Sequence, residues 1–430
     1  MKTVAVIGAG AGGMAAAYDL AKAGKKVTVF EKESTPGGLA AGFKEKSWDW
    51  SLEKYYHHWF MSDSAILSLI KEMGFENKVR FYRPQTVVYH KGDFYPLDSP
   101  VAALLFPGFS FLDKIRFGLV TVFLRYISAW QLLEKYTAHK WMKKYYGTRV
   151  YQTLFEPLLM GKFSSFYKDV NMAWFWARFK VRTPKLGTYV GGFQTFLDNF
   201  AEKLKEMGVN FRFDASVDLI APSDGQKIAV KVNGEDLVFD QAIATLPPKV
   251  LARFAPSLNK GYLDKLDSLQ SLGAVMLILS LKQKLSEKNY YWFNLPKSAG
   301  FPFLALVEHT NFLSPEFFGK EHLVYCGDYL ESDHEYFSLT KEQLVEKFLP
   351  SLKSINSDFD SSWVKRTWLF RTSFAQPIPL VNHSGNIPSV QTPIPNLYFA
   401  SISQVYPWDR GTNFAVKLGR ETADLMNQTA

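Results

Sequence analysis

The stretch that decides the fold is TVAVIGAGAGG, residues 3–13 of a 430-residue chain. Its first part, Thr3–Ile7, is a short apolar run of the kind that forms a buried parallel strand. The residues after it predict a helix from about Gly13 to Ala23, which Gly24 ends. A second apolar run, Val27–Phe30, follows as the next strand. The N-terminus therefore predicts a compact β–α–β unit.

The glycines of the first turn have the spacing G-x-G-x-x-G at Gly8, Gly10 and Gly13, with Gly12 between them. In this pattern the first glycine permits a tight turn, the second lets a pyrophosphate approach the backbone, and the third lets the helix pack on the strand. The phosphates then lie at the positive end of the helix. Glu31 ends the second strand, where a carboxylate accepts hydrogen bonds from ribose hydroxyls. The pattern predicts a bound dinucleotide.

A second glycine pair follows the expected ribose carboxylate. Lys32 comes directly after Glu31, and Gly37, Gly38 and Leu39 come a few residues later. A second close approach of backbone to ligand favours FAD over NAD. With these residues the sequence resembles the flavin-containing amine oxidase superfamily, which includes protoporphyrinogen oxidase and phytoene desaturase. The resemblance implies that all four of these later residues bind FAD.

Further blocks carry the resemblance in the expected order. Gly191–Gln194 opens a helix and resembles the family segment that precedes the second FAD-contacting strand. Ser216–Ile220 is similar to the strand whose valine, here Val217, meets the adenine through its backbone. Ala244–Pro248 resembles the T-x-P segment that closes this subdomain.

The C-terminal block, residues 396–419, resembles the family's last flavin motif. The resemblance assigns to Asp409 an acidic role near the pyrophosphate, with an ordinary carboxylate near a helix start as the alternative. It assigns to Gly411, Thr412 and Asn413 a helix N-terminus that points at the flavin pyrimidine ring. A helix dipole there stabilises negative charge on reduced flavin.

Cys326 is the only cysteine, and it lies outside the C-terminal motif. We therefore expect noncovalent FAD, in contrast to the cysteinyl attachment of some amine oxidases. A disulfide framework and a cysteine-based metal cluster are both excluded. No zinc-ligand spacing occurs either, so no metal site is expected.

The expected fold class is α/β with an α+β substrate part. It comprises a Rossmann-like FAD-binding domain of the glutathione reductase and amine oxidase type, with an interleaved substrate domain that contains a mixed sheet and helices. The FAD-binding domain is expected to be discontinuous, over residues 1–83, 189–258 and 393–430. The substrate-binding domain then covers 84–188, expected to be mostly helical, and 259–392. A hairpin is predicted around Asn233 and Gly234.

The segment WDWSLEKYYHHWF, residues 48–60, is dense in titratable and aromatic groups. In the family this stretch runs beside the flavin ring. We expect Glu53, His57 and His58 to be catalytic, because a neutral histidine can take a substrate proton while hydride moves to the flavin. Adjacent histidines point differently, so only one of them is expected to face the flavin. The alternative is a packed aromatic loop with hydrogen-bonded histidines.

Other residues are candidates for the substrate pocket, although a structural role is the simpler interpretation for several of them. Tyr406 and Trp408 lie near the position of the amine-bracketing aromatic residues of amine oxidases, but in a different local pattern. This departure weakens amine oxidation as the specific reaction. The candidate substrate residues are Tyr56, Trp292, His309, Arg371, Tyr406 and Trp408.

The formal net charge of +9 suits an anionic lipid surface or a phosphorylated substrate better than nucleic acid, because the basic residues are mostly scattered singly among acids. The cysteine content and an N-terminus that begins directly with a strand favour a cytoplasmic protein. The oligomeric state stays open.

The most apolar stretch, Pro100–Leu124, is interrupted by Pro107 and by charged residues, so it is too short to span a bilayer. The simpler interpretation is a set of buried helices in the substrate domain. The alternative is a surface that enters the lipid headgroup region and gives peripheral membrane contact.

Together these patterns favour an FAD-dependent oxidoreductase that moves hydride from a bulky, apolar or amphipathic small molecule to flavin N5. The substrate class is isoprenoid, tetrapyrrole or lipid-linked. One alternative is a flavin-dependent isomerase like UDP-galactopyranose mutase, for which Arg178, Arg182 and Arg371 are candidate diphosphate ligands. Another is a noncatalytic FAD-binding scaffold.

Overall fold

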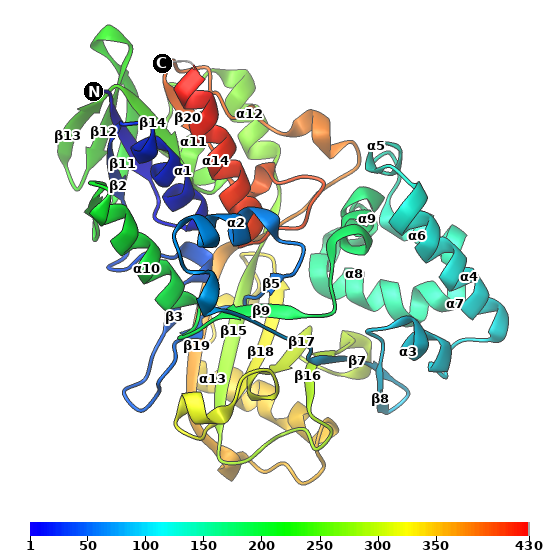
Figure 1. The fold of residues 1–430 in the computed structure, drawn as a ribbon. Coiled ribbons are helices and arrows are strands. Elements are labelled where there is room, and N and C mark those ends of the chain that lie inside the picture. Colours follow the sequence, from blue (N-terminus) through cyan, green and yellow to red (C-terminus); the bar gives the residue numbers. More distant parts are fainter. Residues whose placement is uncertain (429–430) are drawn as a thin grey trace.

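The computed structural model describes residues 1–428, and it contains a parallel five-stranded sheet near the N-terminus (Figure 1). The expected β–α–β unit is present, and three more parallel strands extend it on both sides. Helices cover one face of this sheet, and a three-stranded antiparallel sheet with two short helices covers the other, so the central strands are apolar and buried along almost their whole length. Their order is β10 (Asn210–Arg212), β2 (Lys26–Phe30), β1 (Thr3–Ile7), β14 (Gln241–Ala244) and β20 (Leu397–Phe399).

The first and last long helices cross each other directly at two glycines. A Cβ atom on Gly419 would lie 2.1 Å from the carbonyl oxygen of Gly12, so only hydrogen fits there. This contact joins the C-terminus to the glycine turn. The helices on this lobe are α1 (Ala11–Lys22), α2 (Ser64–Glu72), α10 (Phe193–Glu206) and α14 (Thr412–Gln428).

A three-stranded antiparallel sheet carries the predicted hairpin. Asn233 and Gly234 both have positive φ, 48° and 84°, as a two-residue hairpin turn requires, so the hairpin is confirmed. Two helices follow the adjoining strand β14. The elements are β11 (Val217–Ser223), β12 (Lys227–Val232), β13 (Glu235–Phe239), α11 (Pro248–Phe254) and α12 (Lys260–Ser268).

A second large sheet has seven strands and is mixed, since β16 pairs with β7 in parallel while its other pairs are antiparallel. Two of its strands, β7 and β8, belong to the region that the sequence predicts to be mostly helical. Helix α13 (Lys341–Phe348) packs on this sheet. The order is β19 (Val364–Pro377), β15 (Ser271–Leu281), β18 (His322–Leu330), β17 (Ala305–Glu308), β16 (Tyr290–Asn294), β7 (Gln85–His90) and β8 (Asp93–Pro96).

Two small sheets connect these parts. One pairs β3 (Gly42–Phe43) with β4 (Leu52–Glu53). The other has the order β5, β9, β6, with bounds Trp59–Phe60, Leu186–Tyr189 and Val79–Tyr82. The division of the chain into two interleaved domains, with the residue ranges given above, stays a prediction.

A helical lobe extends to one side of both sheets (Figure 1). Its core is built from aromatic side chains, among them Tyr146, Tyr151, Phe163 and Trp174. Its helices are α3 (Pro100–Leu105), α4 (Phe111–Val122), α5 (Trp130–Leu133), α6 (Ala138–Tyr146), α7 (Thr148–Val150), α8 (Glu156–Phe163) and α9 (Met172–Val181).

Helix α4 contains no buried residue, so the buried-helix interpretation of this apolar stretch is wrong. The helix begins with a capping box at Ser110 and Asp113. Phe117 and Val120 are half-buried against the core of the lobe, and most of its other apolar residues are exposed. Within residues 1–428, no helix combines the length and the hydropathy needed to cross a bilayer.

Candidate cofactor and substrate site

One large cavity, about 1860 Å³ in volume, extends from the glycine turn to the helical lobe. Pockets for single drug-sized ligands typically measure about 300–1,000 Å³, so this cavity has room for a dinucleotide and a second molecule. It lies where the carboxyl ends of β1, β2 and β14 open toward the substrate sheet.

The glycines of the first turn have distinct roles. Gly8 has φ of 106°, in the region that favours glycine. A Cβ on Gly13 would lie 2.1 Å from the carbonyl oxygen of Gly8, so this glycine allows helix α1 to start against the strand. By contrast, a Cβ on Gly10 would have no atom within 4 Å, which places Gly10 against the open cavity. Gly12 also lines the cavity.

Glu31 is 7% exposed and connects the end of β2 to this turn. Its carboxylate accepts hydrogen bonds from the backbone N–H groups of Ala9 at 2.8 Å and Glu33 at 3.1 Å. Both Glu31 and Lys32 line the cavity. The carboxylate is thus held at the position where the sequence places a ribose-binding acid.

The second glycine pair lies beside the first turn. Gly37 donates a backbone hydrogen bond to the carbonyl of Ala9 at 2.9 Å, and Gly10 and Gly37 form a parallel bridge. A Cβ on Gly38 would lie 3.5 Å from the Cα of Gly10. Leu39 lines the same part of the cavity. The two glycine segments therefore form one wall of the cavity, and a side chain on this wall would narrow the cavity.

The C-terminal motif reaches the same cavity. Gly411, Thr412 and Asn413 line it at the start of α14, where the first-turn N–H groups have no intrahelical partner. The Thr412 hydroxyl accepts a hydrogen bond from the Trp59 indole at 2.8 Å, which fixes this helix start. Val217 lines the cavity from the hairpin sheet. The glycine cradle, the ribose acid and the positive helix end fit an FAD molecule.

Both adjacent histidines line the cavity, and which of them faces a bound flavin stays a prediction. His57 Nδ1 lies 2.6 Å from the Tyr55 carbonyl oxygen, so it carries the proton and donates it. Nε2 is left as an acceptor. Burial lowers the pKa of His57 to about 4, which keeps the ring neutral at pH 7.

His58 has a different environment. Its Nδ1 is buried without a hydrogen-bond partner among the described residues. Burial, together with the nearby charge of Arg182, lowers its pKa to about 3. Tyr56 lies next to it in the chain and meets Trp292 edge-to-face, with ring centres 4.7 Å apart. Both of these aromatic residues line the cavity.

Glu53 does not line the cavity. Its carboxylate accepts a hydrogen bond from the Phe193 backbone N–H at 3.1 Å, at the start of α10. Burial raises its pKa to about 7. Its carbonyl oxygen accepts a hydrogen bond from Tyr325 at 2.7 Å. Glu53 thus supports the loop that carries His57 and His58 from the side away from the cavity.

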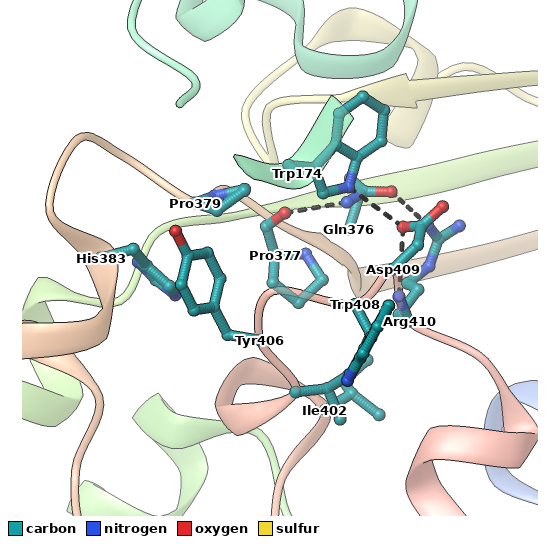
Figure 2. A pocket seen from close by; sticks show the side chains of 11 residues that line it. Trp174, Gln376, Pro377, Pro379, His383, Ile402, Tyr406, Trp408, Asp409 and Arg410 are labelled. Atoms are coloured by element: carbon teal, nitrogen blue, oxygen red, sulfur yellow. Dashed lines mark hydrogen bonds between the residues drawn. The ribbon is translucent and has the colours of Figure 1, made fainter. Parts of the chain in front are cut away.

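Asp409 lies in the cavity wall, but its partners come from helix α9. Arg178 Nη1 lies 2.7 Å from its Oδ2. The Trp174 indole donates to its Oδ1 at 3.2 Å (Figure 2). The neighbouring cations hold the pKa of Asp409 well below its ordinary value. The structure therefore connects Asp409 to a group of basic residues in the helical lobe, and not to the glycine turn where the resemblance places an acid.

Several basic residues around Asp409 were not among the candidates for the oxidoreductase site. Lys162 comes from α8, and Arg410 directly precedes Gly411; both line the cavity. The Arg410 guanidinium donates to the hydroxyl of Tyr329 at 2.5 Å and to the side chain of Gln376. No local sequence pattern marks either residue as part of a site, because the elements that carry them come together only in the folded chain.

Four candidate substrate residues are placed differently. His309 is buried in the substrate sheet against Phe312, Phe318 and Tyr325, outside the cavity wall. Arg371 reaches the cavity edge, but its guanidinium donates to the carbonyls of Tyr336 and Leu339.

Tyr406 and Trp408 line a separate, small pocket behind Asp409 (Figure 2). The Tyr406 hydroxyl donates to Glu134 at 3.1 Å and accepts from Asn171 at 3.0 Å. Trp408 stacks on Phe414, with ring centres 5.7 Å apart. The described residues contain no group of His, Cys, Asp and Glu side chains arranged to hold a metal ion.

The fold and the cavity define a protein with a glycine-lined binding space on a parallel sheet, continuous with a second space beside the helical lobe. The sequence profile described as "Flavin containing amine oxidoreductase" matches residues 11–427, and the chain belongs to this family. Membership implies a flavin cofactor.

Three relatives illustrate the range of this fold. The chain is 24% identical over 329 residues to 15-cis-phytoene desaturase of Synechococcus elongatus, a match that covers 68% of each chain. A proposed protoporphyrinogen oxidase from Exiguobacterium has a similar structure, with a TM-score of 0.79 at 16% identity, covering 100% of this chain and 99% of the other. Reduced UDP-galactopyranose mutase gives a TM-score of 0.80 at 16% identity, covering 100% and 96%. These structural similarities establish the fold alone.

Proposed function

We propose that the protein is an FAD-dependent oxidoreductase that takes a hydride from a bulky, apolar or amphipathic molecule. The observation that carries this proposal is the continuity of the cavity. One end holds the glycine cradle and Glu31, and the other is walled by apolar and aromatic side chains of the helical lobe. These include Phe117, Leu158 and Phe175.

Bound FAD would supply the redox chemistry, accepting a hydride from the substrate at N5. The residues of this chain then have separate tasks. The start of α14 would stabilise negative charge on the reduced ring. His57 Nε2 is a neutral acceptor for a substrate proton, and its Nδ1–H contact with Tyr55 fixes the ring orientation. Cys326 is buried in β18 and does not line the cavity, which supports noncovalent binding of FAD.

The outer face of α3, α4 and the following turn is the proposed contact with a bilayer. Six apolar or aromatic side chains on this face are each at least 68% exposed: Leu105, Phe111, Leu112, Leu119, Tyr126 and Ile127. Such a patch is unusual for a monomeric protein surface.

The net charge of residues 101–150 indicates which kind of bilayer this face would contact. Residues 101–150 carry eight Lys and Arg and only two Asp and Glu, which is +6 of the chain's formal +9. Exposed basic residues around an apolar face match an anionic lipid surface. Leu104, Gly118, Val122 and Tyr126, from the same elements, also line the cavity. An amphipathic substrate would therefore pass from the bilayer into the site.

Vesicle flotation tests the membrane contact. The wild-type protein should float with phosphatidylglycerol vesicles and much less with phosphatidylcholine vesicles. Phe111→Asp with Leu112→Asp should abolish flotation and leave the flavin content unchanged, because carboxylates are compatible with the first turn of a helix. Val238→Ser, which alters a half-exposed residue on the remote strand β13, should float normally. Equal recovery of wild type with and without vesicles would refute the contact.

The redox proposal is tested by purifying the yellow protein and screening for anaerobic bleaching of its flavin with polyenes, porphyrinogens, amines and nucleotide sugars. Bleaching by a bulky apolar donor is the expected result. A protein that stays colourless when FAD is supplied would end the proposal. A flavin that stays oxidised with every donor would favour a noncatalytic scaffold.

A second candidate is a flavin-dependent isomerase acting on a nucleotide sugar, as the name of UDP-galactopyranose mutase suggests. The observation that favours it is the pair Arg178 and Arg182 in the cavity wall. Its test is the absorption spectrum of the dithionite-reduced flavin during titration with UDP-galactose. A perturbed spectrum supports this candidate, and an unchanged spectrum removes it.

A further inference from the structure

Four basic side chains in the cavity wall surround a single carboxylate. They come from three elements: Lys162 from α8, Arg178 and Arg182 from α9 and its C-terminal end, and Arg410 from the loop before α14. The carboxylate is Asp409, which also lines the cavity. We call these five residues the basic cluster.

Asp409 neutralises only part of this charge. Arg178 is its close partner at 2.7 Å, and Arg182 lies 3.6 Å away. Within residues 1–428, no carboxylate lies within 4.0 Å of Lys162 or of the Arg410 guanidinium. Lys162 Nζ instead lies 4.4 Å from the centre of the Tyr329 ring, and Arg410 lies over the same ring at 4.8 Å. Lys162 and Arg410 therefore have no carboxylate counterion, and the cluster carries a formal net charge of +3.

Burial makes this excess costly. The Arg178 side chain is 12% exposed, and an uncompensated charge away from water loses most of its hydration. Burial and the neighbouring charge of Arg410 hold the pKa of Lys162 well below its ordinary value. A fold that keeps four cations together against these costs is arranged to receive an anion.

The pyrophosphate of FAD is not the expected occupant. The glycine turn and the N-terminus of α1 already form the phosphate cradle, and they lie on the parallel five-stranded sheet. Helix α9 instead packs against α5 and α6 in the helical lobe. The cluster is also next to the proposed catalytic segment, since Lys162 and Arg410 lie over the Tyr329 ring and the hydroxyl of Tyr329, after burial, helps to raise the pKa of nearby Tyr56.

We propose that the basic cluster binds a phosphate or diphosphate group of the substrate, whose apolar part lies along the wall formed by α4 and α8. Charge matching favours this class, because a carboxylate would offset one unit of the net charge of +3 and a phosphate or diphosphate offsets two or more. Arginine forks also suit phosphate oxygens. The inference rests on the proposed function in one respect, that this cavity is where the substrate binds.

Calorimetric titration of the FAD-loaded protein tests the head-group preference. Decyl phosphate should bind at least tenfold more tightly than 1-decanol. UDP and inorganic pyrophosphate identify the source of the phosphate. Decyl phosphate that binds more tightly than UDP and pyrophosphate supports a lipid phosphate. UDP that binds more tightly than decyl phosphate, with decyl phosphate still tighter than 1-decanol, supports a soluble nucleotide. Either result supports the phosphate site.

Lys162→Met is the decisive variant, because it removes a charge that has no protein counterion and so leaves no carboxylate unpaired. It should weaken decyl phosphate binding roughly tenfold or more, as expected for a lost hydrogen bond to a charged group, and leave 1-decanol binding unchanged. Lys162→Arg should restore most of the affinity. Lys168→Met removes an exposed lysine from the same lobe and should bind like wild type.

Equal affinity of the wild type for decyl phosphate and 1-decanol would overturn the proposal, and so would an unaltered phosphate preference in Lys162→Met. A loss of FAD in Lys162→Met that parallels the loss of phosphate binding would assign the cluster to the cofactor and overturn it as well. Failure of the oxidoreductase proposal is recognised separately, because calorimetry reports head-group binding even when no donor reduces the flavin.

Discussion

The Glu31 carboxylate accepts a hydrogen bond from the Ala9 backbone N–H at 2.8 Å. This contact joins the end of the second strand to the middle of the glycine turn, 22 residues earlier in the chain. The turn therefore has a fixed shape before any ligand binds. We expect a ribose hydroxyl to bind at Glu31 and a pyrophosphate at Gly10, which belong to one preformed wall of the cavity.

Gly10→Val is the sharpest test of this wall. The backbone of Gly10 has φ of −71°, which valine can adopt, and its Cβ position faces open space. We expect the variant to fold normally and to lose FAD, because the side chain occupies the approach of the pyrophosphate. The ratio of flavin absorbance to protein absorbance after gel filtration measures the loss. A fully yellow variant would place the pyrophosphate elsewhere.

Glu31→Ala tests the ribose contact separately. Loss of hydrogen bonds to a charged acceptor should weaken FAD binding by roughly ten- to a hundredfold. Glu33→Ala is the matched control, since the Glu33 side chain is exposed and only its backbone contacts Glu31. Fluorescence titration of FAD into apoprotein gives both dissociation constants, and equal values for the two variants would contradict the assignment.

His57→Ala and His58→Ala should both retain FAD but differ in turnover. His57 has a fixed ring with a free acceptor nitrogen, so its removal should lower kcat by about 10²–10⁴, the usual contribution of a general base. His58 should matter less. The measurement is flavin reduction by whichever donor bleaches the wild type. Undiminished rates in both variants would assign the segment to packing.

The dinucleotide half of the site is predictable from the sequence because its signals are local. The strand, the turn and Glu31 lie within 31 residues, and each glycine has a backbone reason that the pattern already contains. The hairpin at Asn233 and Gly234 is predictable for the same reason. Such turns depend on φ values that few other residues adopt.

The substrate half is not predictable in this way. Lys162, Arg178 and Arg410 lie on three separate elements, and nothing in their local sequence marks them as neighbours. Asp409 is recognisable by its place in the C-terminal motif, but its role depends on partners more than 200 residues away. Glu53 illustrates the reverse, since a titratable residue in a promising segment turns its carboxylate to a helix start outside the cavity.

The packing of α1 against α14 leads to a stability prediction. Gly419→Ala would place a methyl group 2.1 Å from the Gly12 carbonyl oxygen, so the two helices must separate. We expect a loss of roughly 1–3 kcal/mol in the free energy of unfolding.

Gly118→Ala is the control, because its Cβ meets nothing within 4 Å on the exposed helix α4. That variant should gain about 0.5–1 kcal/mol from helix propensity. Denaturant titration with FAD in excess measures both, and a stable Gly419→Ala variant would show that the helices yield easily.

His309 leads to a prediction about pH, because it is buried outside the cavity and both ring nitrogens lack hydrogen-bond partners among the described residues. Burial lowers its pKa to about 3, from an ordinary value near 6.5 in the unfolded chain. Between these values the unfolded state binds a proton that the folded state does not, so stability falls as the pH falls below about 6.5. From pH 7.5 to 5 this group should cost about 2 kcal/mol.

The variant His309→Leu should therefore lose about 2 kcal/mol less than wild type between pH 7.5 and 5. Glu53 and Glu308, whose pKa values burial raises to about 7, act in the opposite direction but are present in both proteins, so the difference isolates His309. His334→Gln, at a partly exposed position, should change the pH dependence much less. Denaturant unfolding at the two pH values gives the comparison. A change in stability that the substitution causes equally at both pH values cancels from this difference. Parallel pH profiles for wild type and His309→Leu would mean that the imidazole takes up its proton in the folded state as easily as in the unfolded chain.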